Sequence, residues 1–271
     1  MESSASSYRE FAPGLALRPF VECFWHASAD AELPRETMIL PDGSADLILT
    51  FHRGRFHGIR AVGAMTRPLL SRMPPGESML GVRFRPGGAY PFFDLPLKEM
   101  TDRIVDARES SGSFPASLAG HWAAEELHEA IPRGDLLQAV RRLLLAGMKR
   151  NACVEPRIAA AVAVIEGDIA GASVTALSEH LNLSRQHLKR LFDKHTGLGP
   201  AKFIRVVRLQ SLLSALSRLP GEAEPDWADL APGFGWYDQA HLINDFRELT
   251  GSTPGFHFSN TRSPSSAIIE A

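Results

Sequence analysis

The chain has 271 residues, of which 44% are hydrophobic and 22% are charged, and its formal net charge is −2. This length suits one large domain or two domains of common size, with enough apolar residues for real cores. A net charge so close to zero neither indicates nor excludes a nucleic-acid partner, so only the local distribution of charge is informative. Cys23 and Cys153 are far apart and outside any metal-binding pattern, which argues against a disulfide scaffold and a structural zinc site.

The N-terminus carries no sign of a targeting segment. Residues 1–7 are rich in serine and lack the basic start and apolar core of a signal peptide. No run in the sequence approaches the roughly 18 apolar residues of a membrane-spanning helix. We therefore expect a cytoplasmic protein without a membrane partner.

Residues 11–95 have the pattern of short strands. Residues 20–25 form an aromatic run, residues 46–51 have the length and composition of a buried or half-buried strand, and residues 80–85 alternate apolar and charged side chains. Glycine and proline break these runs, with Gly54 at the tip of a hairpin. Short strands at this spacing predict a sandwich or a barrel.

Two pairs of side chains in this half have alternative interpretations. His52 and His57 could be metal ligands of a cupin-like barrel, but such a site needs more ligands, usually with a carboxylate, so we expect surface histidines beside a turn. Trp25 and Phe84 could line a ligand pocket, and we favour core positions for both. Since no catalytic, metal-binding or phosphate-cradling motif is found, we expect no catalytic residue, no metal and no cofactor.

From Leu97 onwards the pattern becomes helical, with candidate helices over residues 99–106, 115–131 and 135–149. The last two helices carry more apolar side chains than a linker needs. These side chains are Leu118, Trp122, Leu127, Leu136, Leu137, Val140, Leu143 and Leu144. They either pack against the β-rich half or join two chains, and we expect a homodimer through this region.

A domain joint is expected at residues 151–155, followed by Pro156 at a first helical position. A helix of residues 157–169 comes next. Residues 174–181 then predict another helix, which a short turn separates from a helix over residues 184–194. Two helices joined by a short turn have the pattern of a helix-turn-helix.

The helix over residues 184–194 has two distinct faces, and Ser184 stands where an N-cap is wanted. Its apolar side chains share one face through their spacing of three and four residues: Leu188, Leu191 and Phe192. Gln186, Lys189 and Arg190 recur at the same spacing on another face, and their donors suit base edges and phosphates. This predicts a recognition helix; the alternative is an amphipathic helix with a solvated charged face.

The helix-turn-helix pattern occurs a second time, about 53 residues further on. The repeat pairs residues 173–178 with 226–231, 181–183 with 234–236, 184–192 with 238–246, and 195–200 with 249–254. Such a long internal repeat indicates a duplicated unit of structure, and it favours the recognition helix over the solvated charged face.

With these motifs, residues 157–258 resemble the DNA-binding domain of AraC/XylS-type transcriptional regulators. The residues that carry the resemblance are Leu183-Ser184, Leu188-Lys189-Arg190-Leu191-Phe192, Thr196-Gly197, Gly199-Pro200, Arg208-Leu209, Gly235-Trp236, Asp238-Gln239-Ala240-His241-Leu242, Phe246, Gly251 and Thr253-Pro254. A weaker match connects the first part to a sensor-like domain of one branch of these regulators. It rests on Leu40-Pro41-Asp42-Gly43, Asp46-Leu47-Ile48, Val62-Gly63 and the run from Gly81 to Gly88.

The resemblance implies roles for particular side chains. In the first recognition helix it directs Gln186, Lys189 and Arg190 toward bases, and Arg185 and Lys194 toward phosphates. In the second it offers the uncharged residues Gln239, Ala240, Ile243 and Asn244. The second motif departs from the family at two positions: Asn244, where an arginine is common, and Pro232, which removes a backbone donor inside its first helix.

Local charge also separates the two motifs. Between Ser173 and Arg208, seven Lys or Arg residues stand against two acidic residues, a net charge of +5. Between Glu222 and Glu248, one Arg stands against seven acidic residues, a net charge of −6, and capping does not explain Asp245. Because DNA affinity comes largely from phosphate neutralisation, we expect the first motif to dominate binding. The second would add shape fit or a few contacts, or face RNA polymerase.

We therefore predict an α+β chain in three parts. Residues 1–150 form a β-rich, barrel-like regulatory domain with following helices, residues 151–262 form an all-α DNA-binding domain with two helix-turn-helix motifs, and residues 263–271 form a disordered tail. The expected function is a sequence-specific regulator that binds double-stranded DNA, with a small-molecule effector as a candidate ligand of the N-terminal domain. The alternatives are a cupin-type enzyme and an interaction module with a degenerate DNA-binding half.

Overall fold

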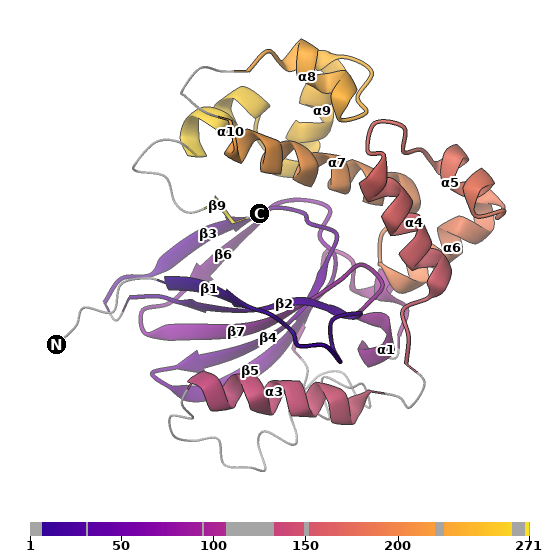
Figure 1. Ribbon diagram of the computed structural model, residues 1–271. Coiled ribbons are helices and arrows are strands. Elements are labelled where there is room, and N and C mark those ends of the chain that lie inside the picture. Colours follow the sequence, from indigo (N-terminus) through magenta and orange to yellow (C-terminus); the bar gives the residue numbers. More distant parts are fainter. Residues whose placement is uncertain are drawn as a thin grey trace.

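The structure is a computed structural model that describes residues 7–30, 32–93, 95–106, 133–148, 152–219, 225–261 and 269–270. Its strands precede its long helices, and the helical part lies above the sheets in Figure 1. The predicted α+β class is confirmed.

Two sheets make up the N-terminal domain. The larger sheet has the strand order β1-β2-β7-β4-β5-β8 and is antiparallel throughout; the smaller has the order β6-β3-β9. The strands are β1 (Ser7–Phe11), β2 (Val21–Ser28), β3 (Arg35–Ile39), β4 (Ala45–His52), β5 (Arg55–Val62), β6 (Leu69–Met73), β7 (Glu77–Phe84), β8 (Ile104–Asp106) and β9 (Ile269–Glu270). Within the expected tail, β9 pairs with β3, and the other tail residues lie outside the described part.

The three strand-like runs of the sequence fall in β2, β4 and β7, which are neighbours in the larger sheet. Gly54, with a φ of 79°, forms the predicted hairpin tip between β4 and β5. Both core predictions are confirmed, because Trp25 and Phe84 are buried on opposite faces of this sheet. His52 is exposed, and the described residues contain no cluster of three or more groups that could hold a metal.

Three short elements follow β7 in the chain: α1 (Tyr90–Phe93), the 3₁₀ turn η1 (Leu97–Met100) and β8, the edge strand of the larger sheet. The prediction of a helix over residues 99–106 is wrong. Asp102 adopts a left-handed backbone (φ 56°) that ends the helical turn, and its carboxylate accepts hydrogen bonds from the amide and hydroxyl of Thr66. The chain then pairs with the free edge of β5, since Ile104 lies opposite Val62.

The predicted helix near residues 135–149 is α3 (Arg133–Gly147). Its buried side chains Leu137, Val140 and Leu144 pack into the core on one face of the larger sheet, where Figure 1 shows α3 beneath the strands. This part of the expected dimer face is thus used within the chain. The expected helix over residues 115–131 lies outside the described residues.

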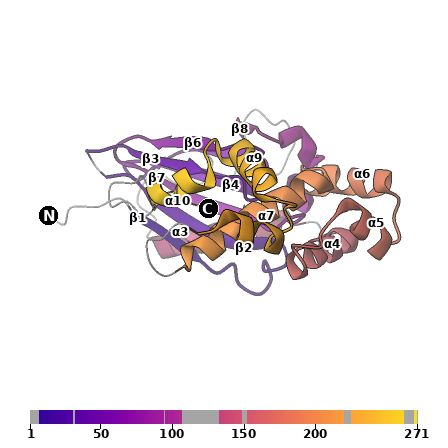
Figure 2. The same ribbon diagram turned by 90° about the horizontal axis from the view of Figure 1, so that it is seen from above.

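Seven helices make up the described part of the C-terminal domain. They are α4 (Pro156–Gly167), α5 (Val174–His180), α6 (Arg185–His195), α7 (Pro200–Ser217), α8 (Trp227–Gly233), α9 (Gln239–Thr250) and α10 (Pro254–Thr261). Figure 2 shows α7, α9 and α10 over the sheets, whereas α5 and α6 project beyond them. No helix of the described residues is long and apolar enough to cross a membrane.

The internal repeat is reproduced in three dimensions. Ser184 caps α6 and Asp238 caps α9, each through its side-chain oxygen and the amide three residues on. The turn inside each motif contains one left-handed residue, Asn182 (φ 51°) and Gly235 (φ 85°). Thr196 and Thr250 end the two recognition helices alike, because each hydroxyl bonds the carbonyl four residues earlier. The predicted duplication is therefore confirmed.

The glycine-containing loops of the N-terminal domain are where the two domains meet. The Gln210 amide of α7 donates to the Pro41 carbonyl at 2.7 Å, and a Cβ at Gly43 would lie 3.2 Å from Phe203. A Cβ at Gly87 would lie 2.9 Å from Ile158 of α4. These glycines, part of the sensor-like motifs, allow the β-domain loops to approach the helices closely.

Candidate nucleic-acid interface

The first candidate recognition helix, α6, is fixed by its apolar side. Leu188 and Phe192 are fully buried in the core of the helical domain. The opposite side chains Gln186, Lys189 and Arg190 are all exposed, as the sequence predicts. A buried apolar stripe behind three long polar side chains is the arrangement that a helix needs to enter a major groove.

The two predicted phosphate contacts are exposed, but each has a neighbour in the structure. Arg185 donates to the Thr175 hydroxyl at 2.8 Å, and this bond links α6 to α5. The Lys194 ammonium lies 5.0 Å from the centre of the Tyr90 ring, which belongs to the N-terminal domain. Both cations keep exposed surface, and nothing in these contacts prevents further bonds to phosphate oxygens.

The second candidate recognition helix, α9, is fixed in the same way. Leu242 and Phe246 are fully buried, while Gln239 and Asn244 are exposed and Ile243 is half-buried. These predicted contact residues lie along one side of α9, so the structure brings them together on one surface.

Pro232 does not shorten the second motif. The helix that contains it, α8, has seven residues, the same number as its counterpart α5. Pro232 stands in the last turn, and its own carbonyl accepts a hydrogen bond from the Gly235 amide. The lost donor therefore affects only the end of the helix.

Asp245 corrects the charge argument made from the sequence. Its side chain is buried rather than exposed to DNA. The carboxylate accepts a hydrogen bond from the Trp236 indole at 3.1 Å and forms an ion pair with Arg205 at 2.9 Å. Glu248 also pairs with Arg205, at 2.6 Å, and lies 3.5 Å from Lys202. The sequence count assigned these acids to one motif and their cationic partners to the other, although they neutralise each other.

A third cation of the first motif, after Arg205 and Lys202, is also used internally. Arg208, half-buried on α7, donates to the Ala172 carbonyl at 2.8 Å. Its guanidinium fills the space beside Gly235, where a Cβ would lie 2.7 Å away. The surface charge of the two motifs therefore differs less than +5 against −6: α6 keeps exposed cations, and the outward side of α9 is close to neutral.

The N-terminal domain contacts α6 directly, which the sequence did not predict. Lys98 of η1 forms an ion pair with Asp193 at 3.0 Å, and Lys189 bonds the same carboxylate oxygen. Burial opposes ionisation of Asp193, but the two lysines hold the pKa of this carboxyl below its usual value. The Thr101 hydroxyl also donates to the Gly197 carbonyl at 2.6 Å. These partners are about 95 residues apart in sequence, so no local pattern could reveal them.

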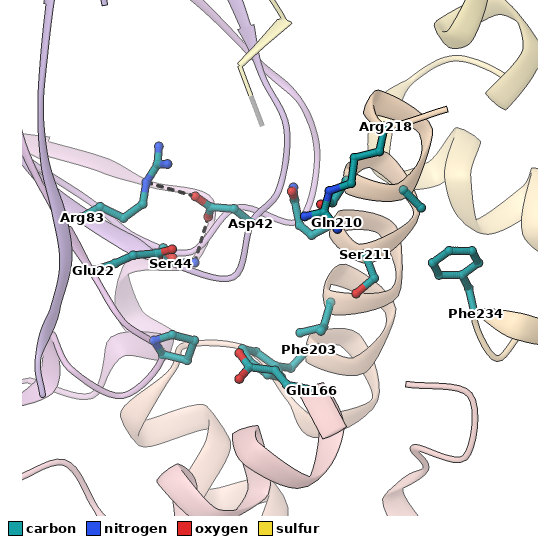
Figure 3. A pocket seen from close by; sticks show the side chains of 14 residues that line it. Glu22, Asp42, Ser44, Arg83, Glu166, Phe203, Gln210, Ser211, Arg218 and Phe234 are labelled. Carbon is teal, nitrogen blue, oxygen red and sulfur yellow. Dashed lines mark hydrogen bonds and ion pairs between the residues drawn. The ribbon is translucent and has the colours of Figure 1, made fainter. Parts of the chain in front are cut away.

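A pocket of about 630 Å³ opens between the two domains (Figure 3). Glu22, Asp42 and Arg83 line it from the β domain, and a polar stripe of α7 that includes Gln210 and Ser211 lines it from the other side. Arg83 lies 3.5 Å from Asp42 and 3.8 Å from the buried Asp46. Burial raises the pKa of Asp46 to about 6, although Arg83 opposes this shift.

Two family matches divide the chain between them. Residues 9–106 match a domain of unknown function (DUF6597), and residues 177–258 match a helix-turn-helix domain. The C-terminal part is an AraC-type DNA-binding domain. Joined to an N-terminal domain, it gives the organisation of an AraC/XylS-type transcriptional regulator and points to a DNA-binding regulator.

Solved structures similar to this chain include ToxT from Vibrio cholerae O395, which is 9% identical and has a TM-score of 0.42. The similarity covers 83% of this chain and 96% of that chain. An AraC-type transcriptional regulator from Chromobacterium violaceum is 21% identical, with a TM-score of 0.36, over 41% of this chain and 96% of that chain. No curated protein matches the sequence. These similarities are low, and the assignment rests on the helix-turn-helix match and the residues described above.

Replacing Arg205 with methionine should destabilise the DNA-binding domain. The change leaves the buried Asp245 carboxylate without its cation, at a cost of roughly 1–3 kcal/mol, because the pair is only partly shielded from water. Urea unfolding followed by circular dichroism measures the effect. The control is Arg247→Met on the exposed side of α9, which should change the unfolding free energy by less than about 0.5 kcal/mol. Equal effects would show that the Asp245–Arg205 pair contributes nothing.

Proposed function

We propose that this chain is a sequence-specific DNA-binding transcriptional regulator that binds its operator mainly through α6. The supporting observation is the exposed row of Gln186, Lys189 and Arg190 opposite fully buried Leu188 and Phe192. Lysine and arginine neutralise phosphates, and arginine can donate two bonds to guanine.

The proposed dominance of α6 does not depend on an acidic α9. Asp245 and Glu248 are paired with Arg205, so they supply little repulsion toward phosphate. What α9 lacks is a cation at the position of Arg190, which Asn244 occupies in the repeat; its own exposed cation, Arg247, stands in the last turn. The difference between the helices is therefore attraction at α6 rather than repulsion at α9.

A paired set of substitutions tests this asymmetry. Lys189→Ala with Arg190→Ala should abolish specific binding, whereas Gln239→Ala with Asn244→Ala should weaken it by less than about tenfold, or about 1.4 kcal/mol. Binding is titrated on an operator mapped by footprinting with the purified protein. Equal losses from both pairs would contradict the asymmetry.

Asn244→Arg provides the complementary variant. It restores the family's cation on an exposed position of α9. If α9 lies in a groove, the added charge should tighten DNA binding and steepen its salt dependence by about one phosphate contact. If α9 instead faces RNA polymerase, the affinity for DNA alone should stay unchanged.

We also propose that a small-molecule effector binds in the pocket between the domains, because both domains line it. Metabolites that raise the melting temperature of the wild-type chain should not stabilise Ser211→Trp, which fills the pocket from α7. The matched control is Ser217→Trp, on the exposed end of the same helix, which should keep the response. A metabolite that stabilises all three proteins alike would bind elsewhere.

We further propose a homodimer through Leu118, Trp122 and Leu127, which lie outside the described residues, because α3 already uses its apolar side within the chain. Analytical ultracentrifugation of the full chain, with and without operator DNA, measures this. A monomer under both conditions would refute it.

A further inference from the structure

The four predicted contact residues of α9 are uncharged, although the helix contains acidic residues and carries an exposed arginine, Arg247, in its last turn. Its acids Asp245 and Glu248 pair with Arg205, and Asp238 is engaged as the N-cap. The predicted contact residues that remain are two amides and two apolar side chains: Gln239, Ala240, Ile243 and Asn244. All except the half-buried Ile243 are exposed.

These four side chains suit one type of base pair. The amides of Gln239 and Asn244 can each donate to N7 and accept from N6 of an adenine. Ala240 and Ile243 offer methyl groups, which pack against the C5-methyl of thymine. Guanine is most often read by arginine or lysine, and α9 has neither among these four residues, whereas α6 has Lys189 and Arg190.

The position of Ile243 is fixed by the fold. Its side chain packs in part against the core of the helical domain while the rest faces outward. Its β-branched side chain has few rotamers, so a contact with a thymine methyl would cost little conformational entropy. The turn before α9 is also held in place, because the Tyr237 amide donates to the His241 imidazole at 3.3 Å.

We propose that α9 reads A·T base pairs, with Ile243 and Ala240 against thymine methyls and the amides of Gln239 and Asn244 on adenine. The guanine contacts of the operator then belong to the half-site of α6. This inference rests on the proposed DNA-binding function and adds the base composition of each half-site.

The experiment changes the DNA first, so that no variant has to fold. Full-length protein is titrated on its footprinted operator and on a copy in which deoxyuridine replaces thymidine in the α9 half-site, which removes only the C5-methyl groups. Each contacted methyl that is removed should weaken binding about fourfold, the equivalent of one buried methyl-sized group. The same replacement in the α6 half-site is the matched control and should have a smaller effect.

A protein variant then assigns the contact. Ile243→Ala should lose the roughly fourfold part of the deoxyuridine effect that belongs to its own thymine and keep the part that belongs to Ala240. Gln239→Ala should remain sensitive to deoxyuridine and lose its preference for A·T over G·C opposite its own position. These two variants separate methyl contacts from amide contacts.

The failure modes are distinct. If deoxyuridine in the α9 half-site has no effect while Lys189→Ala with Arg190→Ala still abolishes binding, the A·T inference is wrong and the proposed function stands. If the wild-type chain protects no operator at all, both are wrong. A deoxyuridine effect that persists undiminished in Ile243→Ala would overturn the role of Ile243.

Discussion

Helix α7 is packed on three sides at once, and the arrangement of the whole chain depends on it. Phe203 packs against Phe192 of the first motif, Arg205 pairs with Asp245 of the second, and Gln210 bonds the Pro41 carbonyl of the β domain. This helix has 18 residues and is about 27 Å long. Because α7 contacts both motifs, it fixes α6 and α9 relative to each other.

The β domain is coupled to this spacer through its glycine loops. Gly43 and Gly87 lie against α7 and α4, and Lys98 and Thr101 hold the C-terminal end of α6. A ligand shifts an equilibrium only by its difference in affinity for the two states. The pocket in Figure 3 is lined from both sides of the domain contact, so an occupant there would bind the docked arrangement differently from an undocked one. This is the physical condition for an effector to alter DNA binding.

Sequence periodicity and capping residues were sufficient to predict the helices that local interactions determine. The period of Leu188, Leu191 and Phe192 and the cap at Ser184 predicted α6, and the repeat then predicted α9. The helix predicted over residues 99–106 failed because Asp102 turns the backbone and β5 offers an edge, which only the folded sheet provides. The charge count failed because Arg205 and Asp245, 40 positions apart, meet in space. Net charge along a sequence cannot show which charges neutralise each other.

In the proposed function, the corrected charges imply different physical roles for the two recognition helices. At α6, Lys189 and Arg190 act by releasing counterions, so this part of the affinity falls steeply as salt rises. At α9, amide and methyl contacts to bases release no counterions, so this part should change little with salt. In the proposed function, the half-site of α6 would therefore supply most of the affinity, and the half-site of α9 would supply discrimination that persists when electrostatic attraction is screened. Because α7 contacts both motifs, the proposed contacts of α9 would form only where α6 is already in register. Amide and methyl contacts would then add specificity without adding affinity for random DNA.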